Sequence, residues 1–306
     1  MTIFALLALA ILPGFIIVHR YYAKDHLQKE PMGVILRSFF WGAAFVIPVG
    51  MFECLFTLGK SPTKLDLAIY YILLVGLSEE VAKYLAIRFY SARNNAFNEY
   101  FDGIVYGACV GGGFATFENV FYVLEHGFAV GIVRAFLSVP GHILWGAIIG
   151  HWIAKECLDK ESMVKTFVLG VGIAALLHGS FDFILSCGST TLLMAPIFVI
   201  TPLVLVRMYS KTALEQDQVF IFGKGSILPV IEKSSIAKIP LVFGLLKILL
   251  YLLSGLFSLF GIFLTIFSVA DYFQKAPDFE TWMFSLPVLS YLLAIGLFRY
   301  GRKFSR

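Results

Sequence analysis

Residues 74–90 (LVGLSEEVAKYLAIRFY) are apolar enough to lie in a membrane-spanning helix, yet they include Glu79, Glu80 and Lys83. On insertion scales, an ionisable side chain near the bilayer centre costs about 2.5–3.5 kcal/mol. Such groups are kept where they face protein or a water-filled cavity. A carboxylate in that setting can take a proton from water and act as a general base. We therefore interpret this glutamate pair as the anchor of a catalytic cleft.

Three later apolar segments carry polar groups of similar chemistry. With a rise of about 1.5 Å per residue in a core of about 30 Å, Glu79 lies near mid-membrane and the others in the outer half. Groups at a shared depth can meet in one site. The candidates are Glu118, Asn119 and Tyr122 in segment 103–124, His142 in 134–154, and His178 and Asp182 in 166–187.

Helical spacing predicts which of these side chains share a face. Glu79 and Lys83 are four residues apart, with the glutamate first, so we expect an ion pair between them. Glu80 points about 100° away and would look into the cleft. His178 and Asp182 share a face by the same spacing, as do Glu118 and Tyr122. Glu53, near the outer end of its segment, is interpreted as an interfacial residue.

Glycines predict how the segments approach one another. Gly103, Gly107 and Gly111 recur every fourth residue, and Gly146 and Gly150 follow His142 at the same spacing. Stripes of small residues let membrane helices pack closely. This packing would bring Glu118 and His142 within reach of their neighbours.

The composition indicates an all-α, polytopic transmembrane helical bundle. The 306 residues are 59% hydrophobic and 14% charged, with a mean hydropathy of +0.84. Lys and Arg gather in alternate loops and in the tail, which predicts an outside N-terminus and a cytoplasmic C-terminus. The net charge of +4 reflects this loop bias and does not indicate a nucleic-acid partner. About nine spans are expected, at 2–18, 33–59, 67–89, 103–124, 134–154, 166–187, 191–208, 240–267 and 283–298.

The spans predict three parts of the chain. Residues 1–208 would form the core, with seven membrane helices. Residues 209–239 are the one substantial polar stretch and are expected to be a cytoplasmic loop. Residues 240–306 would add two helices and a basic cytoplasmic tail.

Glutamate, histidine and aspartate together suit hydrolysis by activated water. The same side chains bind zinc, and a catalytic zinc usually takes three protein ligands plus water. The sequence contains neither an HExxH helix nor a GxSxG nucleophile turn. Hydrolysis with or without a metal therefore remains open from the residues alone.

Four motifs in order resemble the PrsW family of intramembrane proteases, which is related to the CAAX prenyl proteases and the bacterial CPBP proteins. They are EEVAK (79–83), FATFEN (114–119), HILWGAIIG (142–150) and HGSFD (178–182). The loop 21–31 (YYAKDHLQKEP) is also similar to the stretch that follows the first helix in that family. The resemblance covers residues 1–208.

The resemblance implies cleavage of a membrane-anchored protein, such as an anti-sigma factor, in the bacterial cytoplasmic membrane. It implies that Glu79 or Glu80 activates water, with His178 and Asp182 in the catalytic set. Glu118, His142 and His178 would hold a metal such as zinc, and Lys83, Asn119 and Tyr122 would support them. The prenyl-protease branch has a histidine at the Glu118 position, which leaves the metal open.

Two other functions fit the same buried groups. A membrane scaffold or immunity-type protein of this fold would use them for packing. An ion-coupled transporter would use them as an ion pathway, although no inverted repeat supports that function. The sequence leaves the substrate and the oligomeric state open.

Overall fold

The computed structural model describes residues 3–188 and 191–223, and every regular element in these ranges is helical. The π-helix Tyr70–Gly76 joins α3 to α4 without a break, and short 3-10 turns lie at Ser91–Arg93 and Thr191–Met194. The α-helices are α1 (Ile3–Lys24), α2 (Met32–Glu53), α3 (Lys64–Ile69), α4 (Leu77–Phe89), α5 (Tyr100–His126), α6 (Phe128–Phe136), α7 (Ser138–Leu158), α8 (Met163–Ser186) and α9 (Ile197–Phe222).

Five helical stretches in the described residues are long and apolar enough to cross a membrane. The expected spans at 67–89 and 103–124 are helical as well, and they carry the buried carboxylates. The two spans expected at 240–267 and 283–298 lie outside the described residues. The five stretches are Ile3–Lys24, Met32–Glu53, Phe128–Leu158, Met163–Ser186 and Ile197–Phe222.

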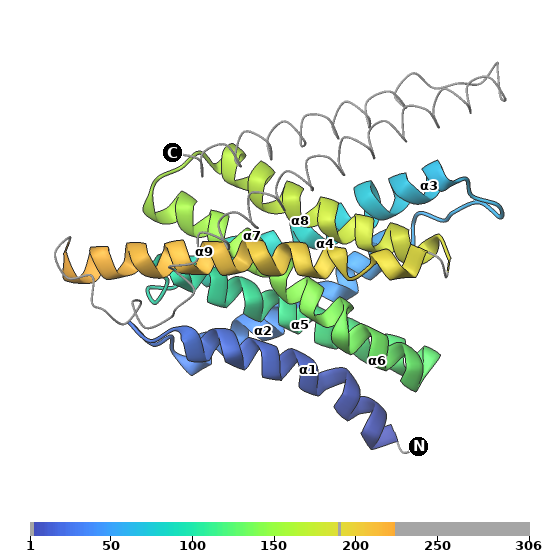
Figure 1. Ribbon diagram of the computed structural model, residues 1–306, viewed down its shortest axis with the longest axis horizontal. Coiled ribbons are helices and arrows are strands. Elements are labelled where there is room, and N and C mark those ends of the chain that lie inside the picture. The colour runs from blue at the N-terminus through green and yellow to red at the C-terminus, as the bar shows by residue number, and fades with distance from the viewer. Residues whose placement is uncertain (1–2, 189–190, 224–306) are drawn as a thin grey trace. The chain divides into compact units, whose positions relative to one another are not determined.

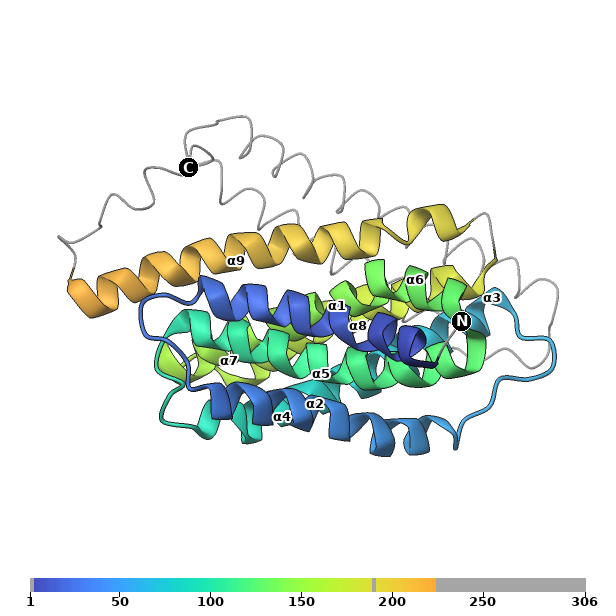
Figure 2. The ribbon, with the colours of Figure 1, turned by 90° about the horizontal axis from the view of Figure 1, so that it is seen from below.

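Helix α5 forms the interior of the bundle, and Figures 1 and 2 show the other helices around it. Its glycine stripe packs against α7 as predicted. A Cβ added to Gly107 would lie 2.2 Å from the Gly146 carbonyl oxygen, and one added to Gly111 would lie 2.2 Å from the His142 carbonyl oxygen. Only a residue without a side chain permits this approach, which sets the depth of His142 relative to α5.

The expected span 67–89 is not one uniform helix. A capping box between Thr63 and Asp66 starts α3, and the π-helix then leads into α4. The π-helix packs against α8 through glycine: a Cβ on Gly179 would lie 2.4 Å from the Ile72 Cα atom. Short π-helical turns recur at functional sites, and this one ends just before Glu79 and Glu80 in the first turn of α4.

The expected span 134–154 is divided between α6 and α7. Leu137 separates them, with a backbone conformation (φ −116°, ψ −60°) unlike that of a regular helix. Pro140 follows in the first turn of α7, where its missing N–H leaves no helical hydrogen bond unmade. The break places Arg134 on a separate short helix beside the end of α5.

Helix α9 corrects the predicted start of the 209–239 loop. It continues through Tyr209 to Phe222 and ends before Gly223, whose φ of +82° suits the end of a helix. Most of the polar residues that suggested a loop are good helix formers or are buried. Tyr209 stacks on His151 at 4.1 Å, and Asp217 accepts the backbone N–H groups of Tyr100 and Phe101.

Candidate active site

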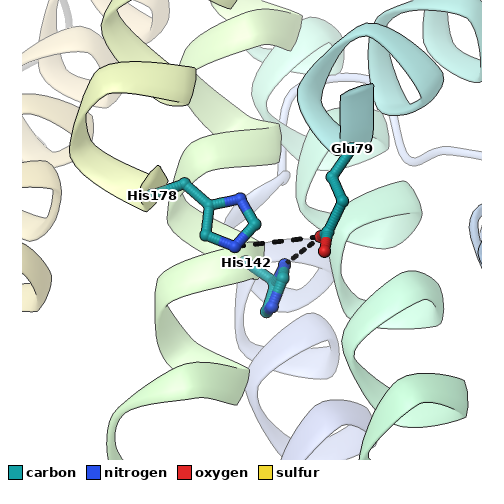
Figure 3. A group of neighbouring side chains, drawn as sticks. All are labelled: Glu79, His142 and His178. Carbon is teal, nitrogen blue, oxygen red and sulfur yellow. Dashed lines mark ion pairs between the residues drawn. The ribbon is translucent and has the colours of Figure 1, made fainter. Parts of the chain in front are cut away.

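Three buried side chains from α4, α7 and α8 converge at one point (Figure 3). The Glu79 Oε2 atom lies 3.7 Å from His142 Nδ1 and 3.8 Å from His178 Nε2. One ligand atom from each of the three residues lies within 4.8 Å of the others. The structure therefore brings together residues that are far apart in the sequence and that the shared-depth prediction had grouped.

Each histidine also contacts a second carboxylate through its other ring nitrogen. His178 Nδ1 lies 2.8 Å from Glu80 Oε1, and His142 Nε2 lies 3.1 Å from Glu118 Oε2. These contacts fix the orientation of both rings, so that the remaining nitrogens face Glu79. A fourth carboxylate, Asp182, places its Oδ2 atom 3.1 Å from His178 Nε2.

Lys83 pairs more closely with Glu80 than with Glu79, which differs from the expected pairing. Its Nζ atom lies 2.6 Å from Glu80 Oε1 but 3.7 Å from Glu79 Oε2. A spacing of three residues shares a helix face as well as a spacing of four does. Glu79 Oε2 is consequently buried without a hydrogen-bond partner among the described residues. Lys83 Nζ also lies 2.8 Å from His142 Nδ1.

Arg134 is a member of the site that was not among the residues expected from sequence. Its Nη2 atom lies 2.8 Å from Glu118 Oε2, and its Nε–H donates to the Asn119 side chain at 3.1 Å. Its guanidinium also lies over the Tyr122 ring, 3.9 Å from the centroid. Arg134 is the first residue of an expected span. A charged residue at the start of an apolar segment was the feature of the sequence that could have identified Arg134 as a site residue.

Aromatic rings from α5 and α7 pack against the two histidines of this centre. Trp145 stacks on His178 with ring centroids 4.3 Å apart, and Phe114 stacks on His142 at 5.6 Å. At the edge, Ser78 donates a hydrogen bond to Glu53 at 2.8 Å. Glu53 therefore contacts the residue next to Glu79 and lies at the edge of the site, whereas the sequence predicted an interfacial residue.

Carboxylates outnumber lysine and arginine in the set of charged side chains that surrounds this centre. Four carboxylates face two cations, so two negative charges remain in excess when both imidazoles are neutral. Burying net charge away from water is strongly unfavourable unless it is compensated. Asp182 is the most open of the six charged side chains, at 23% exposure. The set consists of Glu79, Glu80, Glu118 and Asp182 with Lys83 and Arg134.

These residues fit a divalent metal ion. One carboxylate and two imidazoles are a ligand set that zinc takes in hydrolytic enzymes. The partnerless Glu79 oxygen and the excess of two negative charges both favour a dication at this point. The Lys83 ammonium lies close to His142 Nδ1, but it keeps Glu80 as a partner if that nitrogen binds a metal.

The described residues combine several helices long and apolar enough to cross a membrane with a buried carboxylate–histidine centre, and these are features of an intramembrane hydrolase. Residues 30–207 match the family described as PrsW family intramembrane metalloprotease. The chain belongs to this family, and it is therefore an enzyme, a multi-pass intramembrane protease. The matched residues include every member of the charged set.

Named relatives agree with this assignment. The chain is 36% identical to Protease PrsW of Bacillus subtilis (strain 168) over 184 residues, which are 60% of this chain and 84% of the relative. It is 30% identical to Protease PrsW of Halalkalibacterium halodurans over 203 residues, 66% of this chain and 92% of the relative. It is 33% identical to Protease PrsW of Clostridioides difficile (strain 630) over 189 residues, 59% of this chain and 79% of the relative. No solved structure matches the chain significantly.

Proposed function

We propose that the protease hydrolyses a peptide bond of a membrane-anchored protein at the point where Glu79, His142 and His178 converge. The observation that carries this proposal is the buried Glu79 oxygen, which faces two imidazole nitrogens and has no hydrogen-bond partner in the described residues. Packing alone gives no reason to bury a partnerless carboxylate oxygen, because its desolvation is unfavourable. A scaffold or transporter function is not favoured by membership in a protease family.

Glu79, His142 and His178 would hold the metal, for which zinc is our candidate. When bound, the metal would lower the pKa of a coordinated water and polarise the scissile carbonyl group. Glu80 orients His178, and Glu118 orients His142, through the ring nitrogens opposite the centre. A carboxylate that accepts a hydrogen bond from a metal-binding histidine fixes the orientation of the imidazole ring and raises its basicity. In this arrangement Glu118 contacts the metal ligand His142 and does not bind the metal itself. The family resemblance had implied that Glu118 was a metal ligand.

Asp182 is the candidate that moves protons. Its Oδ2 atom lies 3.1 Å from His178 Nε2, the nitrogen that would bind the metal, and its side chain is the most exposed of the charged set. It would take a proton from the attacking water and pass it to the nitrogen of the leaving peptide. Glu80 is less suited to this role because it is fully buried and already bonds Lys83 and His178.

The setting proposed for this chemistry is the bacterial cytoplasmic membrane. The relatives are bacterial proteins. We propose about nine spans with the N-terminus outside, so that the site lies in the outer half of the bilayer. The three-part division at 1–208, 209–239 and 240–306 is kept as a proposal, except that α9 extends the first part. An anti-sigma-factor-like protein is the proposed substrate.

The test is cleavage of a membrane-anchored reporter by purified protein in lipid nanodiscs, together with metal analysis. We expect one metal ion per chain and loss of cleavage on chelation. Glu79→Gln and His178→Ala should lose both the metal and cleavage, while Asp182→Asn should lose cleavage and keep the metal. Glu125→Gln, at an exposed position near the end of α5, is the matched control. Cleavage at the wild-type rate by folded Glu79→Gln and His178→Ala would refute the proposal.

A further inference from the structure

A second group of buried carboxylates lies at the opposite end of α5 from the active site. Asp25 and Glu30 come from the loop between α1 and α2, and Asp102 comes from the first turn of α5. One carboxylate oxygen of each residue lies within 4.8 Å of the others, and all three residues are buried. At about 1.5 Å per residue along α5, Asp102 and Glu118 are about 24 Å apart. The group is therefore separate from the site described above.

Local hydrogen bonds hold these carboxylates in place. Asp25 Oδ2 accepts the backbone N–H of Glu30 at 3.1 Å. Asp102 Oδ2 accepts the backbone N–H groups of Asn98 and Glu99 at 2.8 and 2.7 Å. The Tyr106 hydroxyl donates to Glu30 Oε2. The loop and the helix are thus arranged around the carboxylates before any ligand is considered.

Two oxygens in this region have no hydrogen-bond partner among the described residues while the acids are ionised. Asp102 is fully buried, and the carboxyl group of Glu30, when it carries a proton, is the hydrogen-bond donor that the described residues offer to its Oδ1 atom. Oε1 of the adjacent Glu99, which is 1% exposed, is also without a partner there. Buried polar atoms are nearly always satisfied by protein, water or an ion. The Asp102 oxygen therefore indicates that a proton or a cation belongs between the carboxylates, and the test below distinguishes the two.

Among the described residues, these acids have no basic side chain as a direct ion-pair partner. Lys29 is near, but its ammonium donates to the backbone carbonyls of Tyr22 and Asp25 at 2.6 and 2.8 Å. No Lys or Arg in the described part of the chain forms an ion pair with Asp25, Glu30, Glu99 or Asp102. The local field therefore favours a bound positive charge.

We propose that Asp25, Glu30 and Asp102 bind one hard divalent cation, Mg²⁺ or Ca²⁺, at a structural site distinct from the catalytic centre. The ligands offered are all oxygen atoms, which Mg²⁺ and Ca²⁺ prefer and which suit zinc less well than imidazole or thiolate. The cation would join the α1–α2 loop to the start of α5. Asp217 of α9 accepts backbone N–H groups at the start of α5, so the cation would also support the end of α9.

The test uses the full-length chain in nanodiscs, freed of metal and titrated with MgCl₂, CaCl₂ or MnCl₂. Calorimetry measures binding, electron paramagnetic resonance follows Mn²⁺, and thermal unfolding gives Tm. We expect one saturable site for a hard cation and a rise in Tm on binding. Because charge count sets the affinity of such sites, Asp102→Asn and Glu30→Gln should each weaken Kd by at least about tenfold.

A control variant shows whether the cation binds at these acids. Glu161→Gln, at a half-exposed acid in the α7–α8 loop that pairs with Lys165, should bind like the wild type. Absence of saturable binding to the wild-type chain would overturn the proposal. Unchanged binding in both Glu30→Gln and Asp102→Asn would also overturn it. A third contrary result is a higher Tm in the metal-free Asp102→Asn variant with no response of the wild type to cations, which would mean that the acids share protons instead.

Discussion

At the scale of single residues, each histidine has two distinct nitrogen atoms with different partners. One nitrogen of each ring contacts a carboxylate that orients it, and the other faces Glu79. The two orienting carboxylates are themselves neutralised, Glu80 by Lys83 and Glu118 by Arg134. In the proposed function, the four outer groups pre-organise the two rings, and Arg134 is a positioning residue that acts through Glu118.

Replacing Arg134 tests this positioning role. Arg134→Gln should destabilise the protein by about 3–5 kcal/mol, because it leaves the largely buried Glu118 carboxylate unpaired. The double variant Arg134→Gln/Glu118→Gln removes both charges and should recover most of that stability. Thermal unfolding in nanodiscs measures the difference, and a double-mutant cycle isolates the pair. Because Glu118 orients His142, we expect the double variant to stay slow in cleavage. Full activity in the double variant would show that the pair contributes only to stability.

At the scale of elements, the packing of α5 against α7 depends on the absence of side chains. Gly107→Ala places a Cβ 2.2 Å from the Gly146 backbone oxygen, which cannot move without shifting α7. Overpacking of this kind costs about 1–3 kcal/mol and sometimes more. Gly172→Ala on α8 meets no atom within 4 Å and should be neutral or up to about 1 kcal/mol stabilising. Equal thermal stability of the two variants would contradict the predicted close contact.

The end of α9 supports the start of α5 through one carboxylate. Asp217 accepts the N–H groups of Tyr100 and Phe101 at 2.6 and 2.9 Å, as a capping residue does. Asp217→Ala should cost about 0.5–2 kcal/mol, the usual range for a lost cap. Glu215→Ala breaks only an exposed pair with Lys211, which is worth about 0–1 kcal/mol. Thermal unfolding of the two variants side by side distinguishes a cap from a surface charge.

At the scale of the whole molecule, all site residues lie within the range that matches the family, and α9 ends shortly after that range. A chain shortened to residues 1–223 should therefore insert into membranes and cleave the reporter within about threefold of the full-length rate, a change of less than about 1 kcal/mol in activation free energy. Reporter cleavage measured at equal membrane content provides the check. A complete loss of cleavage would mean that the later residues contribute to the site or to substrate binding.

Depth and spacing in the sequence were sufficient to select the polar residues that meet in the bundle. Glu79, His142 and His178 could be selected without knowing which residues they contact, because an ionisable side chain in an apolar segment is itself informative. Pairing was less predictable: spacings of three and four residues both share a face, and Lys83 pairs with Glu80. Arg134 was missed because it lies at a segment end, where a cation usually faces water. Helix α9 was cut short because its buried polar residues resemble those of a loop.

The π-helix before α4 has a consequence for changes in chain length. A π-helical turn holds more residues than an α-helical turn, so it can absorb a single inserted or deleted residue by changing its winding. In an uninterrupted α-helix, a one-residue change within Tyr70–Gly76 would rotate α3 by about 100° around the helix axis. Rewinding of the π-helix would avoid this rotation, and Glu79 and Glu80 would keep their places because Lys83 and the two histidines contact them. A one-residue change in the π-helix is therefore expected to leave the proposed proteolytic centre unchanged.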